Sequence, residues 1–164
     1  MFEPWSSYFV AVAGAAAALA GLLIVAVSVS VDKIIAGPGL PGRAGTSIAM
    51  LVLATIVALL GLIPDQTRST FGSSVLILSL GGVVLALASL WSMMKAAVGS
   101  GERRVISAFV KGLLGIAPFV VFSVGAALVV GGPASGLYWM AHAIVLAIIL
   151  ASVNAWVLLV EIRR

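Results

Sequence analysis

Five apolar runs, each about 20 residues long, dominate this 164-residue chain. An α-helix rises about 1.5 Å per residue, so about 20 apolar residues cross the hydrocarbon core of a bilayer. A segment in lipid must satisfy its own backbone hydrogen bonds, and a helix does so within one segment. We therefore predict an all-α integral membrane protein, a bundle of five transmembrane helices. The expected spans are residues 8–31, 44–63, 73–94, 112–130 and 135–160.

The composition agrees with a membrane protein. Hydrophobic residues make up 63% of the chain and charged residues 9%, whereas soluble domains carry about 25% charged residues. A water-soluble fold of this size cannot bury so much apolar surface. The chain has no cysteine, which excludes a disulfide framework and a thiolate metal site. No linker or change of composition divides the sequence, so we expect residues 1–164 to form a single transmembrane domain.

Basic residues are distributed unequally between the two sides of the predicted helices. With five spans, one side holds eight lysines and arginines, and the other holds only Arg68. Cytoplasmic loops are rich in these residues, so we expect an outer N-terminus and a cytoplasmic C-terminus in a bacterial inner membrane. Four spans is the alternative, because only a short uncharged segment separates the last two runs. The eight basic residues are Lys33, Arg43, Lys95, Arg103, Arg104, Lys111, Arg163 and Arg164.

Small residues recur at helical spacing in the first predicted span. Gly14, Ala18 and Gly21 fall on one face of that helix. Small residues allow close approach of helices in lipid, so we expect this helix to pack at the centre of the bundle. The alternative role for the same face is to line a pore or cavity. Glycines in residues 80–84 and 124–132 predict two further points of close approach.

Polar side chains within or beside the spans are the candidates for function. No charged residue falls in the middle of a predicted span, which counts against a proton-coupled or ion-coupled transporter. His142 is the only histidine. We expect it to bond a serine or carbonyl of a neighbouring helix, with proton sensing as the alternative. Asn154 is expected to join helices by a hydrogen bond, and it lies about 120° from His142 around their shared helix.

Charged residues at the cytoplasmic side predict contact with lipid headgroups or a partner. Asp32 follows Ser28 by one turn and is expected either to pair with Arg43 or a nearby lysine, or to remain solvated. Arg103 and Arg104 belong to a predicted interfacial segment, and an anionic leaflet attracts such residues. So small a patch does not predict nucleic-acid binding. The candidate interaction or polar intramembrane residues are therefore Ser28, Asp32, Arg43, Arg103, Arg104, His142 and Asn154.

Motifs for catalysis or cofactor binding are missing. The sequence has no serine–histidine set, no paired carboxylates and no metal-ligand spacing. The glycine-rich stretch SVSVDKIIAGPGLPGRAG, residues 28–45, lacks the ending of a P-loop. We predict a rigid turn there that serves as a partner-contact surface. We expect no enzyme, no cofactor and no metal.

The segments AGLLIVAVS (residues 20–28) and LPGRA (residues 40–44) also carry a resemblance. Over about residues 7–65 the chain resembles a family of small bacterial multi-span membrane proteins. Some members carry an automatic label as modulators of the membrane protease FtsH. The resemblance implies a unit of two helices, and it transfers no catalytic or ligand-binding residue.

Taken together, these features predict a non-enzymatic inner-membrane protein that acts by contact. Its expected partners are membrane lipids and other membrane proteins, or further copies of itself. In that role it would be an accessory subunit or modulator of a larger membrane assembly. The alternative is a homo-oligomeric channel or small transporter lined by the first helix.

Overall fold

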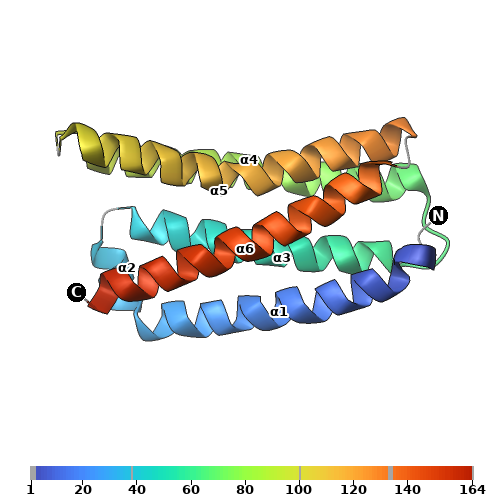
Figure 1. Cartoon of the computed structure of the whole chain (residues 1–164), viewed down its shortest axis with the longest axis horizontal. Coiled ribbons are helices and arrows are strands. Elements are labelled where there is room, and N and C mark those ends of the chain that lie inside the picture. The colour runs from blue at the N-terminus through green and yellow to red at the C-terminus, as the bar shows by residue number, and fades with distance from the viewer. Residues whose placement is uncertain (1–2, 38, 100, 133–134, 164) are drawn as a thin grey trace.

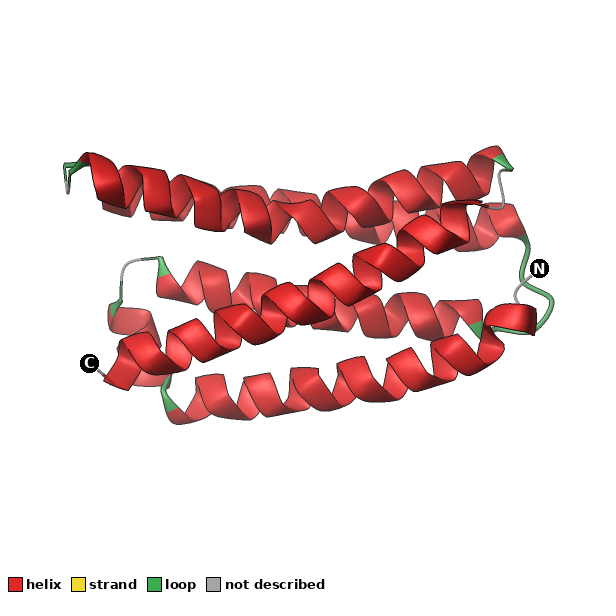
Figure 2. Cartoon of the chain, in the orientation of Figure 1, coloured by secondary structure: helices red, strands yellow, loops and turns green. Residues whose placement is uncertain are grey.

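The computed structural model describes residues 3–37, 39–99, 101–132 and 135–163. These ranges are almost entirely helical and contain no strand (Figure 2). A 3₁₀ turn at Glu3–Trp5 precedes the first long helix, and the short helix α2 (Val31–Ala36) follows it. The long helices are α1 (Ser6–Val29), α3 (Leu40–Gly61), α4 (Arg68–Ala97), α5 (Glu102–Gly131) and α6 (Ser135–Arg163).

Each long helix contains a segment that is long and apolar enough to cross a membrane. The prediction of an all-α bundle with five transmembrane helices, rather than four, is therefore confirmed. The protein is a multi-pass membrane protein. Arg164, one of the eight basic residues on the predicted cytoplasmic side, lies outside the described residues.

The central helix of the bundle is α3. It contacts α1, α4, α5 and α6, with the α4–α5 pair on one side and α1 on the other (Figure 1). In the apolar segment of α3, 56% of the residues are buried, against 22% in α1. The prediction that the first span lies at the centre was therefore wrong.

The small-residue face of α1 points away from the other helices. Gly14, Ala18 and Gly21 are exposed, and a Cβ atom on either glycine would meet nothing within 4 Å. Within this chain, their predicted role in helix packing was wrong. The reason is that α1 is apolar all round, so spacing alone does not say which face is buried. The face that packs carries Phe9, Val12, Ala16, Ala20 and Leu23.

Glycines bring α4, α5 and α6 close together. A Cβ atom on Gly82 of α4 would overlap the ring of Phe119 on α5. A Cβ atom on Gly125 of α5 would lie 3.2 Å from the carbonyl oxygen of Gly136 on α6. Gly82 and Gly125 belong to the two glycine-containing stretches that the sequence singled out, so both predicted points of close approach are confirmed.

The helices extend beyond the predicted spans at the charged loops. Helix α3 begins at Leu40 rather than residue 44, because Pro41 fits the first turn, where its missing N–H is not needed. Helix α5 begins at Glu102 rather than residue 112. Hydropathy marks the apolar part of a helix, whereas glutamate, arginine and lysine are good helix formers that prolong it. The predicted interfacial segment is therefore the first part of α5.

The end of the first span also differs from the prediction. Helix α1 ends at Val29, and Asp32 lies on the separate helix α2. Asp32 therefore does not continue the helix face of Ser28. The chain then reverses at Gly39, whose φ of 77° is left-handed, a conformation that glycine adopts without steric cost.

Candidate functional site

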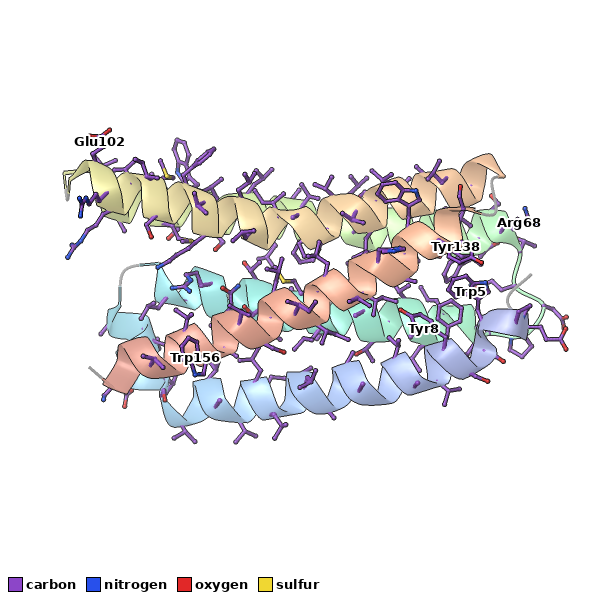
Figure 3. All side chains as sticks on the ribbon, in the orientation of Figure 1. Trp5, Tyr8, Arg68, Glu102, Tyr138 and Trp156 are labelled. Atoms are coloured by element: carbon purple, nitrogen blue, oxygen red, sulfur yellow. The ribbon has the colours of Figure 1, made fainter. Side chains whose placement is uncertain are left out.

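One end of the bundle gathers the basic side chains, and we call it the basic end. The turns that join α2 to α3 and α4 to α5 lie there, together with the C-terminus (Figure 1). Figure 3 shows Glu102 at this end, whereas Arg68 lies at the opposite end. The described basic residues of the α2–α3 and α4–α5 region are Lys33, Arg43, Lys95, Arg103, Arg104 and Lys111.

A cavity of about 390 Å³ opens at the basic end, between the start of α3 and the α4–α5 pair. We call it the basic cavity. Three cationic side chains line it: Arg43 from α3, and Arg104 and Lys111 from α5. None of the described residues in its wall is acidic. The rest of the wall is formed by Gly37, Gly39, Leu40, Met93, Ala96, Ala97, Ser107 and Ala108.

Helical geometry explains why Arg104 and Lys111 both reach the basic cavity, and the packing of α3 against α5 brings Arg43 to them. Arg104 and Lys111 are seven residues apart, which is close to two turns, so they share one face of α5. Arg103 is rotated by about 100° from Arg104; it is exposed and does not line the basic cavity. Arg43 follows the first turn of α3 and is only 8% exposed. The earlier start of α5 is what carries Arg104 to the cavity on a rigid element.

The N-terminus of α3 contributes to the electrostatics of the basic cavity. Gly39 and Leu40, the N-cap and first residue of this helix, are part of its wall. The N-terminus of a helix carries a partial positive charge from the aligned peptide dipoles. This charge adds to those of the three cationic side chains, so the cavity presents a positive potential to a ligand.

A narrow crevice continues from Arg43 and Lys111 into the bundle. Thr46, Ser89 and Asn154 are among the residues that line it. Thr46 donates its hydroxyl hydrogen to the carbonyl oxygen of its own helix four residues earlier, at 2.8 Å. Asn154 is half-buried and brings α6 into contact with the same region. The polar groups below the cavity thus come from three helices besides α5.

Besides His142 and Asn154, three of the predicted candidates lie outside the basic cavity. Ser28 is exposed and donates a hydrogen bond to the carbonyl oxygen of Ile24 at 2.8 Å. Asp32 is exposed on α2 and lines neither the cavity nor the crevice. Arg103 is the third. The sequence did not group Lys111 and Ser107 with Arg43, because that grouping depends on how α3 packs against α5.

His142 belongs to a separate apolar groove of about 720 Å³ near the opposite end. It is exposed, and its Nδ1 lies 2.6 Å from the carbonyl oxygen of Tyr138 in its own helix. A carbonyl only accepts, so Nδ1 carries the hydrogen. The hydroxyl of Tyr8 donates to the carbonyl oxygen of Ala141 at 3.3 Å in the same region. His142 and Asn154 therefore lie in different sites.

The basic cavity is suited to holding an anion. Arginine forks match the oxygens of phosphate or carboxylate groups, and lysine adds a compact charge. Among the described residues, no group of three or more histidine, cysteine, aspartate or glutamate side chains is placed to hold a metal ion. Comparison with known proteins gives no match to a protein-family model, a curated protein or a solved structure.

Proposed function

We propose that this protein is a non-enzymatic protein of the bacterial inner membrane that acts by contact with lipids or other membrane proteins. In this role it is an accessory subunit or modulator of a membrane assembly. The observation that carries the proposal is the convergence of Arg43, Arg104 and Lys111 on one cavity. The unequal distribution of lysines and arginines between the two ends supports a cytoplasmic location for the basic end.

The packed interior supports contact rather than transport. Fully buried large side chains fill the bundle, among them Met50, Phe71, Phe119, Phe122 and Met140. The small-residue face of α1 is on the outside of this chain. A path lined by α1 would therefore have to form between several copies.

A flux measurement separates the proposal from the channel alternative. Purified protein in liposomes is expected to pass ions and small solutes no faster than empty liposomes. Flux that Gly21→Leu abolishes and Gly81→Leu preserves would support an oligomeric channel lined by α1 and contradict the proposal. Gly81 is a matched control, because a Cβ atom on either glycine would meet nothing within 4 Å.

Photo-cross-linking in native membranes tests whether the basic cavity is the contact site. A photoreactive residue at Ser107, in the cavity wall, is expected to give discrete lipid or protein adducts. The same residue at Phe109, which is 51% exposed outside the cavity, is the control. Identical adduct patterns from the two positions would show that the cavity has no special role.

A topology reporter tests the orientation. A reporter that works only in the cytoplasm is expected to be active when it is fused to the C-terminus, and a reporter that works only outside the cytoplasm is expected to be inactive there. Activity of the second kind of reporter at the C-terminus would contradict the proposed orientation. The basic cavity would then face away from the cytoplasmic leaflet.

A further inference from the structure

We infer that the basic cavity binds the phosphate-bearing headgroup of an anionic membrane lipid, and specifically a doubly charged headgroup with two phosphates, as in cardiolipin. This inference rests on the proposed function and names the chemistry of its contact. The proposed function leaves the contacting molecule open, whereas this inference assigns one class of lipid to the basic cavity.

The charges and geometry of the wall fit phosphate. Arg104 is exposed and offers a planar fork of N–H donors, which bonds two phosphate oxygens at once, and Arg43 adds a second positive charge to the wall. Lys111 adds a third positive charge from the same face of α5 as Arg104. The positive end of the α3 dipole lies in the same wall. Three cations and a helix N-terminus suit a dianion better than a singly charged group.

The remaining wall distinguishes a lipid from a free phosphate ion. Met93, Ala96 and Ala97 of α4 and Leu40 of α3 give the cavity an apolar side. A free phosphate ion is hydrated on every side and gains nothing from such a surface. A lipid headgroup continues into glycerol and acyl chains, which the apolar side can cover. The mixed wall therefore matches an amphiphile.

The α4 residues of the cavity wall lie close to an exposed tryptophan, which places the cavity at the depth of the lipid headgroups. Trp91 is 66% exposed, and the Nζ atom of Lys95 lies 5.3 Å from the centre of its ring. Exposed tryptophans mark the boundary between hydrocarbon and headgroups. Ala96 and Ala97 of the cavity wall follow within two turns of Trp91. Basic pockets between transmembrane helices on the cytoplasmic side are typical sites for multiply charged lipid headgroups.

The volume fits two phosphate groups. A water molecule occupies about 30 Å³ in the liquid, so a cavity of about 390 Å³ is much larger than one phosphate group requires. The extra space accommodates the glycerol bridge between two phosphates beside the positively charged wall. A lipid with a single phosphate would leave part of this space and charge unused.

Lipid titration of the purified, delipidated full chain tests the inference. Native mass spectrometry in detergent measures the binding of tetraoleoyl cardiolipin, dioleoyl phosphatidylglycerol and inorganic phosphate. We expect cardiolipin to bind most tightly. Arg104→Ala and Lys111→Ala are each expected to weaken it about fivefold, the factor that one basic residue near an anionic surface contributes. Arg103→Ala is the matched control and is expected to leave the affinity unchanged.

A second variant keeps every charge and fills the space. Ala108→Trp places a large ring in the cavity wall and is expected to prevent cardiolipin binding, with the thermal unfolding of each variant checked in the same detergent. Equal losses for Arg103→Ala and Arg104→Ala would overturn the inference in favour of diffuse surface attraction. Displacement of cardiolipin by millimolar inorganic phosphate would assign the cavity to a soluble anion. Phosphatidylglycerol binding as tightly as cardiolipin would remove the assignment to a doubly charged headgroup.

The two sets of experiments distinguish a failure of the inference from a failure of the proposed function. Protein adducts from the probe at Ser107 without cardiolipin binding would overturn the inference and leave the proposed function in place. Cardiolipin binding together with ion flux would contradict the proposed function and leave the lipid site intact.

Discussion

Gly42 of α3 lies directly against Ser89 of α4. A Cβ atom on Gly42 would come within 2.7 Å of the Ser89 Oγ and 3.3 Å of the Ser89 Cα. The contact sits beside Arg43, and Ser89 is part of the crevice below the basic cavity. The missing side chain of one glycine therefore sets the distance between two walls of the candidate site.

Substitution of Gly42 is expected to separate α3 from α4. Gly42→Ala displaces the Ser89 hydroxyl and presses on the Ser89 Cβ and Cα atoms, and overpacking of this kind costs about 1–3 kcal/mol. Thermal unfolding in detergent measures the loss. Gly45→Ala is the control on the same helix, because a Cβ atom there would meet nothing within 4 Å. Equal melting temperatures for the two variants would show that α3 and α4 are not in tight contact at this point.

The adjacent glycines Gly81 and Gly82 of α4 provide a second matched pair. A Cβ atom on Gly82 would overlap the buried ring of Phe119, whereas one on Gly81 would meet nothing within 4 Å. Gly82→Ala is expected to lower the free energy of unfolding by about 1–3 kcal/mol, since Phe119 has little room to move. Gly81→Ala is expected to leave it unchanged or slightly raised, because alanine is the better helix former. The reverse order of stabilities would contradict the packing of α4 on α5.

Two alanines of α1 test which face of this helix packs in the bundle. Ala16 is fully buried, and Ala18 is exposed. Ala16→Leu is expected to destabilise the protein by about 1–3 kcal/mol through overpacking, and Ala18→Leu is expected to have no effect on unfolding. The oligomeric state of Ala18→Leu is measured alongside. A destabilisation by Ala18→Leu greater than that by Ala16→Leu would mean that the small-residue face is the one that packs.

The fold follows from the sequence because hydropathy and length dominate it. Five long apolar runs leave helices as the available structure in lipid, and close approach at Gly82 and Gly125 follows from the small size of glycine. The neighbours of each helix were harder to predict. Helix α1 is apolar on all sides, so the spacing of Gly14, Ala18 and Gly21 marks a face without saying whether a helix or lipid covers it.

The basic cavity was predictable only in part. Its cations were visible in the sequence as charged residues beside the spans, and the positive-inside rule places them on one side. The cavity itself depends on two features that hydropathy does not report. Helix α5 begins well before its apolar segment, which carries Arg104 and Ser107 onto a helix face. Arg43 meets that face because α3, rather than α1, is the central helix.

The hydroxyl groups of Ser79 on α4 and Ser123 on α5 lie 2.9 Å apart. Each also lies close to a carbonyl oxygen of its own helix: Ser79 to that of Leu76 at 3.0 Å, and Ser123 to that of Phe119 at 2.9 Å. Two hydroxyl hydrogens cannot make three hydrogen bonds at once. The bond between the helices therefore competes with a bond inside one helix, which limits what it contributes to stability.

A double-mutant cycle measures that contribution. Ser79→Ala, Ser123→Ala and the double variant are expected to give a coupling energy of about 0.6 kcal/mol, the average for hydrogen bonds between membrane helices. Each single change leaves the remaining serine bonded to its own helix carbonyl, so neither leaves a buried hydroxyl without an acceptor. Ser73→Ala, exposed on α4 and bonded to the carbonyl oxygen of Thr70, replaces Ser79→Ala in the control cycle, where no coupling is expected. A coupling energy of zero for Ser79 and Ser123 would show that both hydroxyls remain bonded within their own helices.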